Sequence, residues 1–491
     1  MKPLLKMAVL PIVTALVVVS GCLPVVAQSK FPAYPPDSLT KNTHKMQMLE
    51  QLGIQLPLLP STRIDPNRPK ATTPRYPDSL SDSPYGWADT KEYGEGSPKN
   101  LYFFRTDWGL WTNYKEELVG EYEPIDLLRA EDGTVINTPE LWWDKRYPEL
   151  LERCQDDIWG YVPKEADKLA IHWQTVMRSV EDSVCGSSIC KEITGTIQTS
   201  VFPEIKHAPL IKAKLWLPAH LKKGEKAPVM IHIGECRPEF KKAFFEQGWV
   251  YLEFEHQALQ PDHGAFLSDY LIGLVNKGNW RKPQDWGTLR AWAWGVSRLI
   301  DYLENSESEQ VDAAKCGVIG FSRLGKTAIV AGVFDSRISI VYAGCSGCLG
   351  VTPVRRHFGE DLEFIPYYWF AGNMMKYGGP LKEGSYLPRK VANLKVDTHA
   401  FIALLAPRTL FITAGADDLW SDSKGAAISA RGATPVYELL GKKGLVMKDN
   451  NPTLNTVYDE GSIAFHYHEG AHVYSLQSLP VFVKLAKSEF Q

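Results

Sequence analysis

Short apolar runs alternate with helix-like patterns along the chain from about residue 121 onward. Between the runs, apolar residues recur at helical spacing, most clearly over 289–303. The runs typical of buried strands cover 228–233, 249–254, 317–320, 338–342 and 409–413. Strands that alternate with helices predict a mostly parallel sheet that is covered by helices on both faces.

The region before this alternation has a different pattern. Apolar residues at helical spacing predict a helix over 139–159, and alternating polar and apolar residues predict early antiparallel strands over 193–201 and 210–217. Residues 28–75 are rich in Pro, Ser, Thr and Asn, which is typical of a tether or a loosely packed arm. Residues 76–120 carry no pattern that we can assign.

The N-terminus has the features of an export signal. Lys2 and Lys6 accompany an apolar stretch over 7–19, which is short for a membrane span. The stretch is followed by Ser-Gly-Cys22, which is typical of a bacterial lipoprotein signal. Cleavage before Cys22 would leave a diacylated cysteine that anchors stably in a membrane. The alternative is ordinary signal peptidase cleavage after Ala27. We therefore expect an exported protein, held as a lipoprotein in the periplasm or at the cell surface, or otherwise secreted.

These patterns divide the chain into a signal peptide (1–21), a Pro-rich tether with an unassigned extension (22–120) and an α/β domain (121–491). The net charge of -3 gives no basic surplus for nucleic acid, so the lipid at Cys22 is the only membrane contact that we expect. The 15 Trp and 21 Tyr suit stacking on sugar or aromatic rings, although most should pack in the core. Nothing in the sequence indicates an oligomeric state.

Seven cysteines follow Cys22. An oxidising compartment permits disulfides, and Cys185 and Cys190, with a Gly-Ser-Ser turn between them, form the best local pair. Cys345 and Cys348 have the spacing of a metal or redox pair. The sequence contains no second such pair, so we interpret these two cysteines as structural.

A candidate nucleophile lies where the run over 317–320 meets a helical pattern. A buried strand that turns sharply at Ser322 into a helix would expose the hydroxyl at the carboxyl edge of the sheet. The helix N-terminus would then offer a backbone N–H to an oxyanion. Gly320 and Gly325 lack the side chains that a tight turn excludes. The motif departs from Gly-x-Ser-x-Gly, because Leu324 stands where the second glycine is expected.

A catalytic serine needs a base and an acid that orients it, which follow the serine in the order acid, then histidine, in α/β-hydrolases. The strand over 409–413 leads to Asp417 and Asp418. We favour Asp418 as the acid and keep Asp417 as the alternative. His472, beside Gly470 near the C-terminus, is the preferred base.

His466 and His468 lie on one face of a strand-like run, so a His-x-His metal site must be considered. The sequence offers no spaced cluster of further ligands, and we expect neither a metal nor a cofactor.

Several segments, in this order, resemble carbohydrate esterase family 15, over about residues 121–491. The matching segments include Gly-Phe-Ser-Arg-Leu-Gly-Lys (320–326), Arg-Arg-His-Phe-Gly-Glu (355–360), Tyr-Tyr-Trp-Phe (367–370), Asp-Leu-Trp (418–420) and the histidine segment that ends at His472. The resemblance implies an α/β-hydrolase fold, with an irregular N-terminal extension outside it.

The resemblance also implies roles for individual residues. Ser322 is the nucleophile, His472 the base, and Arg323 a cation that faces the oxyanion. In part of the family the acid is a Glu at a position that matches Cys345 here, so the role falls to Asp418. Residues that contact the glucuronic acid would be Lys326, Glu360, Trp420 and, as a further wall, Trp369. The loop over 234–237 is where a second oxyanion N–H would come from.

The resulting hypothesis is a serine esterase that cleaves glucuronoyl esters between plant glucuronoxylan and lignin, such as 4-O-methyl-glucuronoyl methyl esters. One alternative is an acetyl (xylan) esterase on the same fold. Another, of a different class, is a non-catalytic glycan-binding lipoprotein. The presence of Cys345 in place of the Glu would be consistent with such a protein.

Overall fold

The computed structural model describes most of the chain from residue 121 onward and a few earlier segments. The described residues are 35, 40–54, 104–105, 111–114, 116–119, 121–182, 184–199, 205–222, 224–235, 237–362, 365–382, 385–387 and 390–491. All belong to one compact unit, Tyr34–Gln491. The expected signal peptide, Cys22 and Cys236 lie outside these residues. Across the described segments, no helix has both the length and the apolar character that a bilayer crossing requires.

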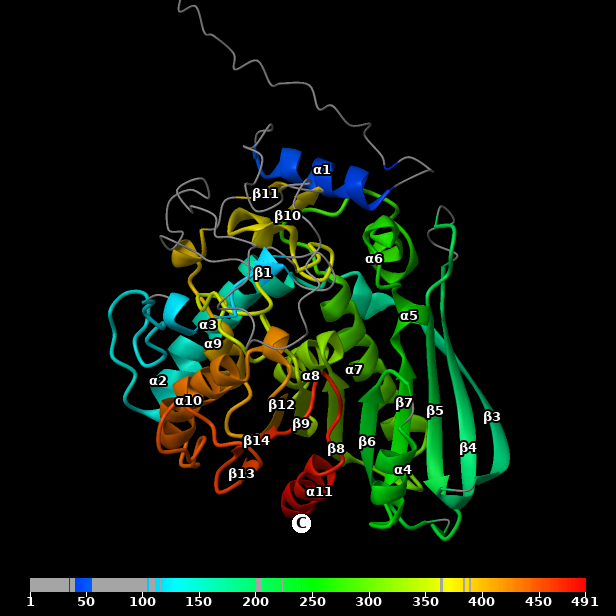
Figure 1. Cartoon of the computed structure of the whole chain (residues 1–491). Helices are drawn as coiled ribbons and strands as arrows, with labels where there is room; N and C mark the ends of the chain where they lie inside the picture. The colour runs from blue at the N-terminus through cyan, green and yellow to red at the C-terminus, as the bar shows by residue number, and fades with distance from the viewer. Residues whose placement is uncertain are drawn as a thin grey trace, which may run out of the picture. The chain divides into compact units, whose positions relative to one another are not determined.

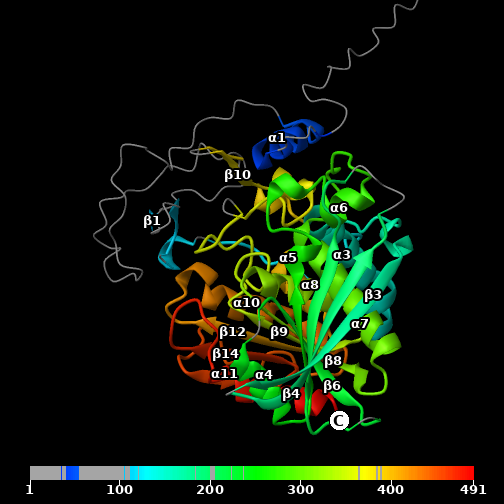
Figure 2. The same ribbon diagram turned by 90° about the vertical axis from the view of Figure 1, so that its right-hand side faces the viewer.

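The unit is built on a ten-stranded sheet with the strand order β13-β14-β12-β9-β8-β6-β7-β5-β4-β3 (Figures 1 and 2). Its central strands run parallel: β6 (Ala227–Ile233), β7 (Val250–Glu255), β8 (Val311–Phe321), β9 (Ile338–Gly344), β12 (Thr409–Gly415) and β14 (Ile463–His468). The antiparallel strands lie at the edges: β3 (Ile171–Asp182), β4 (Gly186–Ile197) and β5 (Leu210–Pro218) on one side, and β13 (Thr456–Tyr458) on the other. The α/β-hydrolase prediction is thus confirmed.

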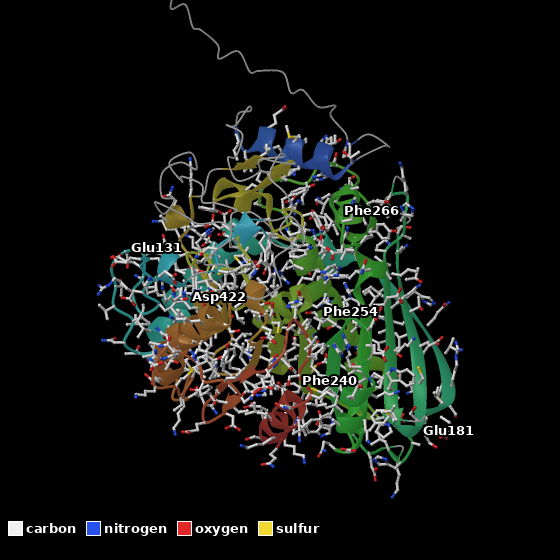
Figure 3. The ribbon with its side chains drawn as sticks, viewed as in Figure 1. Glu131, Glu181, Phe240, Phe254, Phe266 and Asp422 are labelled. Atoms are coloured by element: carbon white, nitrogen blue, oxygen red, sulfur yellow. The ribbon has the colours of Figure 1, made fainter. Side chains whose placement is uncertain are left out.

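Both faces of the parallel strands are buried, because successive side chains point to opposite faces. In β12, Leu410 and Ile412 join the core on one face, whereas Phe411 joins the core on the other. The first core also takes residues from α7 (Thr288–Ser306), α8 (Arg323–Phe334), α9 (Thr398–Ala403) and α10 (Ser423–Leu439). The second takes them from α4 (Pro238–Phe245) and α11 (Ser478–Glu489). Phe254 and Phe240, labelled in Figure 3, belong to the first and second core respectively.

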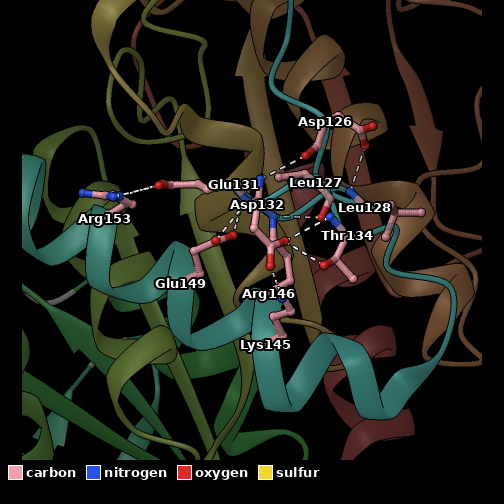
Figure 4. A network of polar contacts seen from close by, with 10 residues as sticks. All are labelled: Asp126, Leu127, Leu128, Glu131, Asp132, Thr134, Lys145, Arg146, Glu149 and Arg153. Atoms are coloured by element: carbon pink, nitrogen blue, oxygen red, sulfur yellow. Dashed lines mark hydrogen bonds and ion pairs between the residues drawn. The ribbon is translucent and has the colours of Figure 1, made fainter.

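The helix predicted over 139–159 is interrupted by wider turns. It comprises α2 (Pro139–Leu141), a π-type turn at Trp142–Arg146, α3 (Tyr147–Cys154) and a second π-type turn at Gln155–Trp159. Arg146 donates to the carbonyls of Asp126 and Leu127 at 3.0 and 3.2 Å, and Glu149 accepts from the Glu131 N–H at 3.0 Å (Figure 4). These bonds attach the preceding loop to the helix.

The proposed Cys185–Cys190 disulfide is wrong. Cys190 is a free thiol on β4, where it pairs in register with Arg178 of β3 and Trp216 of β5. The strand β4 begins at Gly186, and four extended residues span about 13 Å, which is too far for a disulfide. The sequence pattern had suggested a turn, but the segment continues a hairpin with β3, which was not predicted.

A helix, α1 (Lys41–Gln51), occurs in the segment expected to be a tether. Thr40 caps it by accepting from the Thr43 N–H, and its buried Met48 packs so closely on Gly372 that a Cβ there would lie 2.2 Å from the sulfur. Gln51 donates to the Arg281 carbonyl at 2.9 Å. Residues 40–54 are therefore part of the folded unit.

The other short elements of the described residues are β1 (Phe104–Arg105), β2 (Trp111–Thr112), α5 (His256–Leu259), α6 (Tyr270–Val275), β10 (Gly379–Lys382) and β11 (Ser385–Leu387). Figure 1 does not label the 3₁₀ turns at Glu116–Leu118, Ala166–Lys168, Gly264–Phe266, Gly372–Lys376 and Val391–Asn393. One further 3₁₀ turn, Leu419–Ser421, follows β12 and carries part of the site described next.

Candidate active site

Four neighbouring parallel strands each deliver one residue to the same edge of the sheet. Ser322 follows β8, Cys345 follows β9, Asp418 follows β12 and His472 follows β14. The carboxyl ends of parallel strands meet at one edge, where ligands of α/β folds generally bind. Residues that are 150 positions apart in the sequence therefore converge because of the strand order alone.

Ser322 occupies a strained turn between β8 and α8. Its backbone has φ 55° and ψ -128°, a conformation that L-residues rarely adopt, and its N–H donates to the Gly344 carbonyl at 2.8 Å. A Cβ at Gly320 would lie 2.0 Å from the Leu324 carbonyl oxygen, and a Cβ at Gly325 would lie 2.9 Å from Ser346. The turn therefore requires glycine at 320 and 325, and position 324 can carry a leucine.

Asp418 and His472 are in direct contact. The His472 Nδ1 lies 2.6 Å from an Asp418 carboxylate oxygen, and the buried carboxylate also accepts from the Ser421 N–H at 3.3 Å. The His472 ring packs against Phe321, with 4.7 Å between ring centroids. The neighbouring Asp417 is exposed, and its N–H donates to the Gly470 carbonyl. The geometry thus pairs Asp418 with the histidine, as the sequence analysis favoured.

Cys345 lies against this pair. Its sulfur, an Asp418 oxygen and a His472 nitrogen all lie within 4.8 Å of one another. The side chain is 2% exposed, and burial together with the Asp418 charge raises the pKa of its thiol well above the usual value. The thiol therefore stays protonated at neutral pH and cannot replace a carboxylate as the orienting acid.

Arg323, the first residue of α8, is held by a residue that the sequence analysis missed. Its Nε lies 2.5 Å from one carboxylate oxygen of Asp262, and the other oxygen accepts from the Trp369 indole at 2.6 Å. Asp262 thus fixes two of the predicted site residues at once. It lies in an irregular loop after α5, where no motif or periodicity marks it.

Ser322, Arg323 and His472 line one cavity of about 940 Å³. Gly234 and Glu235, from the loop predicted to supply a second oxyanion N–H, line the same cavity. Its other walls include the charged residues Lys212, Lys214, Glu253 and Glu255 from β5 and β7. The predicted sugar contacts Lys326, Glu360, Trp369 and Trp420 are not among its lining residues.

Three of those predicted contacts, Lys326, Glu360 and Trp420, lie instead around the loop that follows β12 and carries Asp418. The Lys326 ammonium, which is 2% exposed, lies 2.7 Å from a Glu360 oxygen that also accepts from the Cys348 N–H. The Glu360 N–H donates to the Trp420 carbonyl at 2.7 Å. The Lys326–Glu360 ion pair therefore joins α8 to the segment after β9, and the Glu360 backbone joins that segment to the loop that carries Asp418. Trp420 and Trp369 are half-buried.

His466 and His468 each contact a polar group of the protein through Nδ1. The His466 Nδ1 contacts the Ser478 hydroxyl at 2.7 Å, and the His468 Nδ1 contacts the Glu469 carbonyl. Neither belongs to a group of three potential ligands within the described segments. Burial lowers the pKa of both imidazoles, which indicates neutral core histidines.

Comparisons with known proteins indicate what this chain is similar to. A family model described as glucuronyl esterase, fungi, matches residues 206–441. The curated carbohydrate esterase MZ0003, from an unknown prokaryotic organism, is 28% identical over 418 residues, which cover 76% of this chain and 91% of the relative. A 4-O-methyl-glucuronoyl methylesterase of Schizophyllum commune is 29% identical over 331 residues, which cover 64% of this chain and 73% of the relative.

Solved structures extend the comparison to the fold. A glucuronoyl esterase of family 15 from Teredinibacter turnerae has a TM-score of 0.70 at 28% identity, covering 92% of this chain and 100% of that one. A glucuronoyl esterase from Solibacter usitatus has a TM-score of 0.65 at 27% identity, covering 77% of this chain and 100% of that one. With a strained serine in the turn between β8 and α8 and an aspartate–histidine pair at the adjoining strand ends, the chain is similar in sequence and in fold to the glucuronoyl esterases of carbohydrate esterase family 15, which are carboxylic ester hydrolases.

Proposed function

We propose that this chain is a glucuronoyl esterase that hydrolyses esters of 4-O-methyl-glucuronic acid, of the kind that join glucuronoxylan to lignin, and that it uses Ser322, His472 and Asp418. The observation that carries the proposal is the 2.6 Å contact between His472 and Asp418, in a chain whose relatives are named glucuronoyl methylesterases. It also disfavours a non-catalytic glycan-binding protein, because binding alone does not require an acid, a histidine and a strained serine at adjacent strand ends.

The first step is acyl transfer to Ser322. Asp418 accepts a hydrogen bond from the His472 Nδ1–H, so the lone pair of Nε2 is free to take the serine proton. The serine oxygen attacks the ester carbonyl, and His472 then gives the proton to the departing alcohol. In the second step the same histidine activates a water that releases the glucuronate.

Negative charge develops on the carbonyl oxygen during both steps. The backbone N–H that follows the nucleophile belongs to Arg323, at the N-terminus of α8, where the helix dipole favours an anion. The Arg323 guanidinium adds a fixed positive charge, because Asp262 restrains it. A restrained cation stabilises the transition state without reorganising as the charge forms.

Recognition of the sugar is assigned to Lys326, Glu360, Trp420 and Trp369. One Glu360 oxygen already accepts from Lys326 and Cys348, so the other oxygen can accept from a sugar hydroxyl. Trp420 and Trp369 are half-buried aromatic residues of a type that stacks on sugar rings. The buried Lys326 would then act mainly by holding the Glu360 carboxylate in place.

The decisive test compares methyl glucuronate with an acetylated sugar ester as substrates. We expect hydrolysis of the glucuronate ester, and in Ser322→Ala a loss of kcat of at least 10³-fold with an unchanged melting temperature. Activity on the acetate alone would be consistent with the serine mechanism but would identify the protein as an acetyl xylan esterase. Full activity of the folded Ser322→Ala variant would rule out the serine mechanism.

Export and a lipid anchor at Cys22 are part of the same proposal. They are supported by the N-terminal charge, the apolar stretch and the Ser-Gly-Cys22 sequence. When a nonionic detergent solution is separated into two phases, the mature protein should partition into the detergent phase. The Cys22→Ser variant should partition into the aqueous phase. A wild-type protein that stays aqueous after export would favour the secreted form, cleaved after Ala27.

A further inference from the structure

Cys345, Asp418 and His472 bring three different metal-binding groups together beside the catalytic cavity. One atom from each, the thiol sulfur, a carboxylate oxygen and an imidazole nitrogen, lies within 4.8 Å of the other two. The first two side chains are buried, whereas that of His472 is 32% exposed. In the described part of the chain, no other set of His, Cys, Asp and Glu meets this condition.

The spacing suits a tetrahedral metal ion after a small movement. Zn²⁺ binds sulfur at about 2.3 Å and nitrogen or oxygen at about 2.1 Å, so neighbouring ligand atoms lie roughly 3.3–3.7 Å apart. The His472 and Asp418 atoms, now 2.6 Å apart, would have to separate by about 1 Å. The His472 side chain is 32% exposed, so its ring has room to shift while the two buried residues keep their positions.

We propose that these side chains form a site for a thiophilic divalent cation such as Zn²⁺ or Cd²⁺, and that its occupation inhibits the esterase. Thiolate and imidazole are the protein ligands that such cations prefer, and a carboxylate completes a three-ligand set with a fourth position open to water. The inhibition rests on the proposed function, whereas the binding of the metal does not.

Inhibition follows from the two nitrogens of His472. As the sulfur–metal bond forms, the Cys345 thiol releases its proton to solvent. The metal takes the lone pair of Nδ1, so the ring proton moves to Nε2. A protonated Nε2 is a donor and cannot accept the Ser322 proton. One proton is released for each metal bound, and no group is oxidised or reduced.

Binding is tested without activity, by titrating Cd²⁺ into the full-length Ser322→Ala protein. A cadmium–thiolate bond gives an ultraviolet charge-transfer band, which we expect at one equivalent. Adding Cys345→Ser to this protein should abolish that band. Cys190→Ser, which removes another buried free thiol in β4, should leave it unchanged.

Inhibition is tested on the enzyme with an intact Ser322. Zn²⁺ should reduce the hydrolysis of methyl glucuronate reversibly, with activity restored by a chelator. In Cys345→Ser, with each protein normalised to its own metal-free rate, we expect at least tenfold weaker inhibition. A cadmium band that survives Cys345→Ser would overturn the site itself. Metal binding without inhibition would overturn the inhibitory role. A protein that does not hydrolyse methyl glucuronate but still gives the Cys345-dependent band would contradict the proposed function and leave the metal site standing.

Discussion

At the scale of single residues, Asp417 and Asp418 differ in role although they are adjacent. Asp418 is buried and contacts His472, whereas Asp417 is exposed and contributes its backbone to the Gly470 loop. The order of the motifs predicts that the acid is a carboxylate that follows β12. Both Asp417 and Asp418 fit that prediction. The choice depends on the direction of each side chain after the strand, which tertiary packing determines.

Replacing each of these carboxylates by an amide separates the two roles. In Asp418→Asn the amide can donate to Nδ1 and favour the wrong tautomer of His472, so we expect kcat for methyl glucuronate to fall by roughly 10³–10⁴-fold. In Asp417→Asn we expect a rate within about twofold of the wild type. Steady-state kinetics on the two folded variants check this, and equal losses would contradict the assignment of the acid.

At the scale of elements, the sequence pattern was sufficient to predict the buried parallel strands and insufficient to predict several other elements. Runs such as 228–233 and 409–413 match β6 and β12 because a strand buried on both faces must be continuously apolar. The strand β3 was missed because its outer residues are exposed, including Val176 and Met177. The helix α1 was missed because it is largely polar and is stabilised by contacts with distant segments, such as that of Met48 with Gly372.

The elbow between β8 and α8 gives a prediction at this scale. A methyl group at Gly320 would meet the Leu324 backbone at 2.0 Å, and a backbone atom cannot rotate away. We expect Gly320→Ala to reduce the free energy of unfolding by about 3 kcal/mol or more and to lower activity with it. Gly133→Ala is the control: it meets no neighbour and should cost only about 1 kcal/mol, from its positive φ. Similar melting temperatures for the two variants would mean that the elbow relaxes.

At the scale of the whole molecule, buried histidines couple folding to pH. Burial lowers the pKa of His44 and His232 to about 3, and of His256 and His466 to about 4. In the unfolded chain these imidazoles have a pKa near 6.5. Below that pH the unfolded chain binds more protons than the folded one, so the free energy of unfolding falls as the pH drops.

The melting temperature should therefore be highest near pH 7 and decrease between pH 6.5 and pH 5. Each buried histidine contributes roughly 1–2 kcal/mol over this interval. Carboxyls whose pKa is raised by desolvation, such as Asp157 and Asp285, act in the opposite direction at lower pH. His44→Leu, in a pocket formed with Trp280 and Tyr367, should make the pH dependence shallower. A melting temperature that does not change from pH 7 to pH 5 would contradict this account.

The convergence of β9 and β12 on one histidine also bears on ancestry. The resemblance implies that some members of the family carry the acid at the position of Cys345, whereas we propose Asp418 as the acid here, and both side chains lie within 4.8 Å of His472. An ancestor with a carboxylate at each position could lose either one and keep an oriented histidine. A carboxylate at the end of either of these neighbouring strands could therefore orient the same histidine.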